Sequence, residues 1–183
     1  PGSSTRRIML DVIIALLPAA VAGVVIFGLS AVWTILTCVV AAVLAEFLFS
    51  LCTKRKQTIG DLSAVVTGLL LALNLSTAVP LWQCAIGSVF AIVIVKGCFG
   101  GIGKNLVNPA IAARVFLLLC FTSTVAGGAA PVADLTATAT PLVTINQGAA
   151  AAKAISLSSL FFGNYGGAIG ETCTIALLLG FVY

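Results

Sequence analysis

Only five side chains in this sequence are acidic, and no histidine accompanies them. The acids are Asp11, Glu46, Asp61, Asp134 and Glu171. Without histidine, the chain cannot build His-ligated haem, a His-containing zinc site or a Ser-His-Asp triad. The acids form no acid–base constellation, so we predict no catalytic residue. An ionisable group inside an apolar segment is costly in a bilayer and is a functional candidate by default.

The six cysteines give no metal-binding pattern. They stand at positions 38, 52, 84, 98, 120 and 173, and no two form a CxxC pair. Local ligation of zinc or an iron–sulfur cluster is therefore not predicted. Most of these cysteines fall inside apolar runs, where we interpret them as small hydrophobic residues. A metal bound by distant cysteines, or shared with another subunit, stays open.

A glycine-rich stretch at residues 100–105 could bring the backbone close to a ligand. It lacks the first glycine and the final Ser or Thr of a P-loop, and it also fails the dinucleotide pattern. We interpret it as a bend between helices, in which Gly101 and Gly103 allow close approach of the backbone. Asn105 and Asn108 offer the donors and acceptors that a flat heteroaromatic ring needs. The alternative is that both asparagines cap the helix that follows.

Composition places these residues in a membrane. Of the 183 residues, 61% are apolar and 8% are charged, whereas an ordinary soluble domain has about 25% charged residues. So little charge excludes most soluble enzymes, intrinsic disorder and nucleic-acid-binding modules. The sequence therefore predicts an all-α integral membrane protein.

Apolar runs predict a single membrane domain over residues 1–183, built as a multi-spanning helix bundle. The runs cover about 8–29, 31–52, 61–75, 81–98, 109–125 and 170–183. The last run is shorter than the roughly 20 residues that a spanning helix needs, and the chain begins without Met. We therefore predict that the sequence is a fragment of a longer protein. The segment 126–167 contains no spanning run.

Basic residues predict the orientation of the chain. If each run crosses once, seven of them share one side, and Lys153 lies in a loop on the other. The seven are Arg6, Arg7, Lys54, Arg55, Lys56, Lys96 and Lys104. The positive-inside rule then places the amino terminus in the cytoplasm and the segment 126–167 outside.

An internal repeat predicts broken helices. Residues 60–70 and 170–180 both place a glycine, an acid and a small polar pair before a Leu-rich helix. In the predicted topology they run in opposite senses, which is typical of inverted repeats. Asp61 and Glu171 would then lie at opposite ends of an ion path, with Glu46 a third candidate. The alternative is chance similarity between two helix starts that acids cap, and Asp11 is expected to pair with Arg7.

Several of these stretches together resemble one family. Residues 100–110, Asp134 with 139–141, and 163–172 stand in the order and approximate spacing of the RnfD and NqrB membrane subunits of the Rnf and Nqr respiratory complexes. The segment that begins at Asp61 fits the same pattern. The resemblance covers nearly the whole chain.

The resemblance implies flavin cofactors. Family members carry FMN on a threonine through a phosphoester, within a motif whose last threonine corresponds here to Thr140. The motif is imperfect because Ala137 stands where the family has Ser or Thr, so Thr136 and Thr138 are competing attachment sites. In the Nqr relative, asparagines that match Asn105 and Asn108 lie beside a non-covalent riboflavin.

The resemblance also implies a function. It predicts a multi-pass subunit of the cell (inner) membrane that passes electrons between flavins in step with ion transport, in an Rnf ferredoxin:NAD oxidoreductase. Its partners would be RnfA, RnfB, RnfC, RnfE and RnfG. The alternatives are an NqrB-like subunit of a Na⁺-translocating NADH:quinone oxidoreductase and, in a different class, a solute channel or transporter with inverted repeats.

Overall fold

The structure of the protein is a computed structural model, and it describes residues 5–54, 58–101, 103–126, 128–129, 137–138, 161–163 and 166–183. Apart from a ladder of two-residue strands, the regular elements in these ranges are helices, so the predicted all-α integral membrane fold is confirmed. In chain order they are α1 (Thr5–Phe27), α2 (Leu29–Cys52), a 3₁₀ turn η1 (Ile59–Asp61), α3 (Ser63–Asn74), α4 (Leu81–Phe90), a π-helix η2 (Ala91–Gly97), α5 (Pro109–Cys120), α6 (Thr122–Val125), β1 (Gly128–Ala129), β2 (Ala137–Thr138) and α10 (Thr174–Val182).

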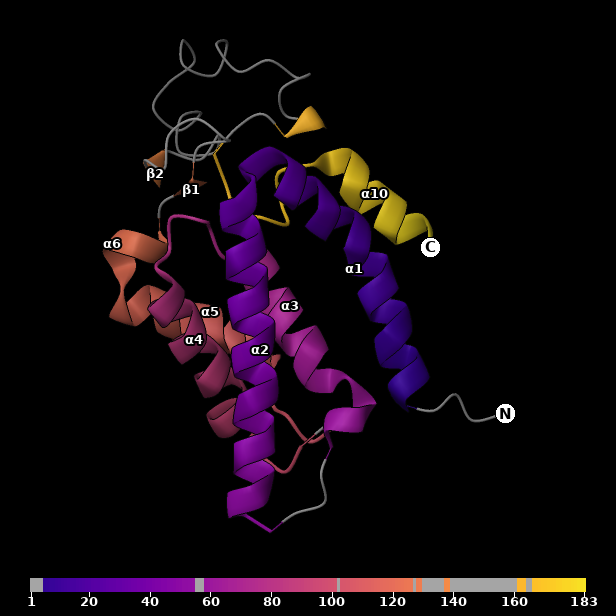
Figure 1. Cartoon of the computed structure of the whole chain (residues 1–183), viewed down its shortest axis with the longest axis vertical. Helices are drawn as coiled ribbons and strands as arrows, with labels where there is room; N and C mark the ends of the chain where they lie inside the picture. Colours follow the sequence, from indigo (N-terminus) through magenta and orange to yellow (C-terminus); the bar gives the residue numbers. More distant parts are fainter. Residues whose placement is uncertain are drawn as a thin grey trace.

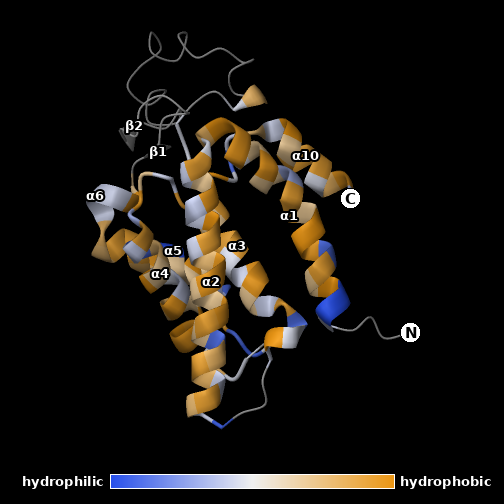
Figure 2. Ribbon diagram, viewed as in Figure 1, coloured by the Kyte–Doolittle hydropathy of each residue, from blue (hydrophilic) through white to orange (hydrophobic). Residues whose placement is uncertain are grey.

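Two helices are long and apolar enough to cross a membrane. The helices α1 and α2 contain 23 and 24 residues, which gives each a length of about 35 Å at 1.5 Å per residue. A hydrocarbon core is about 30 Å thick. Gly28, at φ 68°, separates them. Figure 2 shows apolar residues over most of the visible surface of both helices and hydrophilic residues at the lower ends of the bundle.

The helices α3 and α5 are too short to span alone. Each has 12 residues, or about 18 Å of helix. The predicted run 109–125 is interrupted at Phe121, whose φ of −133° and ψ of 49° leave the helical region before α6 begins. The ring of Phe121 lies edge-on to Trp82, 5.2 Å between centroids. Arg114 of α5 donates to Asn74 Oδ1 of α3 at 3.0 Å, which connects the two short helices.

Small residues let α2 and α3 pack closely. The buried face of α2 carries Ala31, Thr34, Cys38, Ala42 and Ala45. A Cβ on Gly68 of α3 would lie 2.8 Å from the carbonyl oxygen of Cys38. Small residues at helix interfaces allow such approach of the backbones in membranes.

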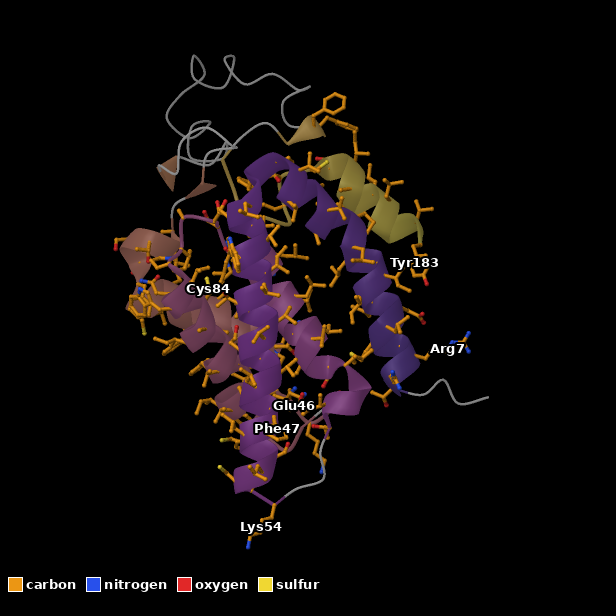
Figure 3. The ribbon with its side chains drawn as sticks, in the orientation of Figure 1. Arg7, Glu46, Phe47, Lys54, Cys84 and Tyr183 are labelled. Atoms are coloured by element: carbon orange, nitrogen blue, oxygen red, sulfur yellow. The ribbon has the colours of Figure 1, made fainter. Side chains whose placement is uncertain are left out.

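The two ends of the bundle differ in what they carry. Figure 1 shows the antiparallel pair of β1 and β2 near the upper end, and the last turn of α2 together with η1 toward the lower end. Arg7 and Lys54 also lie in the lower half of the molecule (Figure 3). The strands therefore lie away from the end that carries most of the described basic residues.

The segment before α10 packs against the far end of α3. Ile169 N–H donates to Leu75 O at 3.0 Å, and Gly170 N–H donates to Leu73 O at 2.8 Å. The helix α10 begins only at Thr174, so the expected helix start at Gly170-Glu171 is wrong: these two residues form a turn. From there α10 runs back along the upper half of α1 (Figure 1), where Gly180 contacts Ala15.

Candidate ion and cofactor sites

The strongest polar cluster in the described part of the chain surrounds Glu46. Its Oε1 atom accepts a hydrogen bond from Lys96 Nζ at 2.5 Å and another from Thr58 Oγ1 at 2.6 Å. Lys96 Nζ also donates to Ser63 Oγ at 2.5 Å. Glu46 is 4% exposed and Lys96 is 5% exposed. The cluster therefore contains an ion pair that is removed from solvent.

Four separate elements position this cluster. Glu46 comes from the lower half of α2, above Lys54 (Figure 3), and Thr58 precedes η1. Ser63 begins α3, and Lys96 lies in the last turn of the α4–η2 helix, which ends at Gly97. The helix is π-helical in η2. Cys98 N–H continues the same hydrogen-bond pattern by donating to Val93 O at 3.1 Å. π-Helical turns are rare and occur frequently at functional sites.

One oxygen of the Glu46 carboxylate has no partner in the part of the chain that the structure describes. Oε2 is buried and makes no hydrogen bond to any residue that the structure describes. A cavity of about 90 Å³ adjoins the cluster, lined by Glu46, Phe49, Ser50, Thr58, Ile92, Lys96, Gly97, Gly100 and Gly101. Buried charges without full hydrogen bonding are costly, so this carboxylate has unused capacity to bind a cation or a proton.

Sequence reasoning selected Glu46 but missed its partners. The orientation argument counted Lys96 among the basic residues of one membrane side but did not predict that its ammonium is buried inside the bundle in an ion pair with Glu46. The sequence did contain a signal for this pairing. Lys96 directly follows an apolar stretch, and Glu46 lies within another apolar run. Two opposite charges inside apolar helices are expected to pair with each other.

Asp61 and Glu171 lie at opposite ends of α3. Asp61 Oδ1 accepts from Ser63 N–H at 2.9 Å and so caps the first turn of α3. Glu171 Oε1 accepts from Ala168 N–H at 3.0 Å, in the turn that pairs with the last residues of α3. Asp61 thus has the capping role of the alternative interpretation. Glu171 does not cap α10, since it closes a turn that ends before that helix.

The expected pairing of Asp11 with Arg7 is wrong. Both residues are described and exposed in α1, and they form no ion pair with each other. Solvent-exposed helix pairs at this spacing contribute only about 0.3–0.5 kcal/mol, so little opposes their separation.

The glycine-rich bend holds itself in shape with the two asparagines. Asn108 Oδ1 caps α5 by accepting from Ala110 N–H at 2.9 Å. The Asn105 amide nitrogen, in the orientation that satisfies its hydrogen bonds, donates to Val95 O and Gly101 O, each at 3.2 Å. Gly101 and Gly103 have φ values of 96° and 79°, and a Cβ on either would meet no atom within 4 Å.

This bend retains groups that fit a flavin. The Asn105 carbonyl oxygen and the Asn108 amide nitrogen have no hydrogen-bond partner among the described residues. One acceptor and one donor match the pyrimidine edge of an isoalloxazine ring, which presents both N–H and C=O groups. The open space beside Gly101 and Gly103 leaves the backbone accessible to a planar ring.

Thr140, the predicted site of covalent FMN, lies outside the described residues, as do Asp134 and Thr136. Thr138 ends β2, which pairs with β1 in the register Gly128 to Thr138. The predicted outward segment 126–167 is therefore described only at these strands and near its two ends.

Comparison with known proteins relates the chain to one family. All of residues 1–183 match the family described as NQR2, RnfD, RnfE. The chain is 48% identical to the RnfD subunit of the Na(+)-translocating ferredoxin:NAD(+) oxidoreductase complex of Acetobacterium woodii, over 98% of this chain and 57% of that protein. It is 38% identical to the corresponding subunit of the proton-translocating ferredoxin:NAD(+) oxidoreductase complex of Clostridium ljungdahlii, with the same coverage.

A third relative belongs to an ion-translocating oxidoreductase complex of Stutzerimonas stutzeri. The corresponding subunit of that complex is 35% identical over 97% of this chain and 59% of its own length. Nearly the whole of this chain matches these three relatives, but the chain spans only a little over half of their length.

Proposed function

The chain belongs to the NQR2, RnfD, RnfE family, and from this membership we propose that it is the electron-transferring membrane subunit of an ion-translocating ferredoxin:NAD oxidoreductase, the Rnf complex. One observation carries the proposal: nearly the whole chain matches the RnfD subunits of such complexes in two bacteria. Both of these relatives are named for ferredoxin and NAD, which favours an Rnf subunit over the NqrB-like alternative.

In this proposal FMN is attached to Thr140 by a phosphoester bond. The support is the resemblance of residues 134–141 to the family motif and the position of β2, which ends at Thr138 near the upper end of the bundle. A flavin supplies the one-electron chemistry that amino-acid side chains of this composition lack. Thr136 and Thr138 remain the competing attachment sites.

A second, non-covalent flavin would lie at the glycine-rich bend. The Asn105 carbonyl and the Asn108 amide would hold its polar edge, while Gly101 and Gly103 leave room for the ring. The bend lies at the opposite end of the bundle from β1 and β2 (Figure 1). Two flavins on this chain would thus serve opposite sides of the membrane, with the amino terminus cytoplasmic and Thr140 outside.

Ion transport would use Glu46 inside the bundle and Asp61 and Glu171 at the ends of α3. The support is the burial of Glu46 with an oxygen that has no partner in the described chain. RnfA, RnfB, RnfC, RnfE and RnfG would complete the electron path in the cell (inner) membrane.

Covalent flavin in the denatured subunit tests the proposal. The intact complex is purified from membranes, separated on a denaturing gel and viewed under ultraviolet light. We expect a fluorescent band at the mass of the full-length subunit, because a phosphoester survives denaturation. Absence of fluorescence from a fully expressed subunit would contradict the flavin proposal, and it is the result that a solute channel would give.

A further inference from the structure

We propose that Lys96 is a tethered counter-cation, which occupies the cation position of Glu46 in this state and must leave before a transported cation can bind. The inference rests on the proposed function, in which Glu46 lies in the ion path. It adds Lys96 to that path. It also gives a rule for the path, namely that the Glu46 carboxylate binds only one cation at a time.

Charge balance gives the first reason for the rule. Glu46 and Lys96 together are neutral, and both are almost fully buried. A second cation would leave the site with a net positive charge in a low-dielectric interior, where an uncompensated charge is strongly unfavourable. Entry of an external cation is therefore coupled to departure of the ammonium group or loss of its proton.

The donor set gives the second reason. Lys96 Nζ donates to Glu46 Oε1 and Ser63 Oγ, and Thr58 Oγ1 donates to the same Oε1 atom. When Lys96 leaves, these three oxygen atoms remain as ligands, together with Glu46 Oε2, which has no partner among the described residues. Hard cations prefer oxygen ligands. The ammonium of Lys96 thus contacts the same kind of oxygen atoms that would ligate a sodium ion.

The helix that carries Lys96 gives the third reason. Residues Ala91–Gly97 are π-helical, and Gly101 N–H donates to Lys96 O at 2.9 Å in the same wide pattern. A return to α-helical winding changes the register by one residue, which rotates the side chains beyond it by about 100°. Such a change would carry the Lys96 side chain away from Glu46.

Space for the displaced ammonium is present next to the pair. The cavity of about 90 Å³ is bordered by Lys96 itself and by Gly97, Gly100 and Gly101. Since a water molecule occupies about 30 Å³ in the liquid, the cavity has room for a hydrated ammonium head. It also adjoins the glycine-rich bend, so movement of Lys96 and the conformation of that bend are physically connected.

Carbodiimide labelling of Glu46 tests the inference, because the reagent modifies protonated carboxyl groups in apolar surroundings. The complete complex in membranes is treated with dicyclohexylcarbodiimide, and the adduct is quantified by mass spectrometry. In the unmodified protein, Lys96 is expected to protect Glu46. In Lys96→Met the carboxyl group loses the ammonium that protects it, so labelling should rise about tenfold or more, and Na⁺ should suppress it.

Matched variants separate the effect of the Lys96 charge on labelling from the effect of its side-chain shape. Lys96→Gln keeps a hydrogen-bond donor without the charge and should also label strongly; it serves as the second test if Lys96→Met does not assemble. Lys96→Arg keeps the charge and Ser63→Ala keeps the ion pair, so both should resemble the unmodified protein. Equal labelling of Glu46 in the unmodified protein, Lys96→Met and Lys96→Gln would overturn the inference, as would labelling of the two variants that Na⁺ does not affect.

A separate measurement tests the proposed function. Glu46→Gln should lower the number of ions transported per electron in proteoliposomes while flavin content stays normal. If that ratio is unchanged, Glu46 is outside the ion path. The labelling result still reports whether Lys96 occupies the cation position of this carboxylate, because it does not depend on turnover.

Discussion

Gly170 donates its backbone N–H to the carbonyl oxygen of Leu73 at 2.8 Å, which joins the turn before α10 to the last residues of α3. The last carbonyl groups of a helix have no partner within the helix. This contact therefore satisfies a backbone group that would otherwise be exposed to the apolar interior. It also places the Glu171 turn at one end of α3, while Asp61 caps the other.

Substitution of Gly170 by alanine should weaken this junction. A Cβ at Gly170 would lie 2.7 Å from the Cβ of Leu73 and 3.0 Å from its carbonyl oxygen. Overpacking of this kind costs about 1–3 kcal/mol, so we expect a lower midpoint of thermal inactivation for the assembled complex. Gly60→Ala is the matched control, because its Cβ would meet no atom within 4 Å. Equal thermal midpoints for the two variants would contradict the role of Gly170.

The covalent flavin is predicted to depend on Thr140 alone. Thr140→Val removes the hydroxyl that forms the phosphoester while it keeps the size of the side chain. The denatured subunit of this variant should show no fluorescence. Thr136→Val and Thr138→Val are the controls and should retain it. Fluorescence in Thr140→Val together with its loss in either control would move the attachment site to that neighbour.

The non-covalent flavin is predicted to depend on Asn105 and Asn108. The double variant to leucine should deplete riboflavin extracted from the complex, while the fluorescence of the covalent adduct remains. Because Asn108 also caps α5, its loss should cost about 1 kcal/mol in stability. Asn108→Asp is the control for this effect, since it keeps the capping oxygen but removes the amide donor. Normal riboflavin in both the double variant and Asn108→Asp would reject the site.

The two acids at the ends of α3 can be neutralised while each keeps an oxygen that accepts a hydrogen bond from a backbone N–H. Asp61→Asn keeps an oxygen that accepts from Ser63 N–H, and Glu171→Gln keeps one that accepts from Ala168 N–H. If these charges serve ion entry and exit, either variant should lower the number of ions transported per electron in proteoliposomes. Flavin content and assembly should not change.

Removal of the Asp61 acceptor is the structural counterpart of that experiment. Asp61→Ala should destabilise the start of α3 by about 0.5–2 kcal/mol, the usual cost of a lost cap. A normal transport ratio in both Asp61→Asn and Glu171→Gln, combined with a destabilised Asp61→Ala, would show that these acids act only in the fold.

The sequence alone was sufficient for features that depend on a few neighbouring residues. High hydropathy over both segments identified the two long helices, because a membrane span is a property of about 20 consecutive residues. The apolar run that begins at residue 109, with Asn108 as a candidate cap, indicated the start of α5 for a similarly local reason. The family could be identified because its motifs are short and occur in a fixed order, and the match over residues 1–183 confirms it.

Tertiary structure decided the features that depend on how helices face one another. Lys96 and Glu46 are 50 residues apart, and hydropathy says nothing about the rotation that brings a π-helical lysine against α2. The break at Phe121 and the late start of α10 were also missed, because apolar side chains continue through both positions. Their backbone is set by contacts with Trp82 and with the end of α3, and such contacts exist only once the helices have packed.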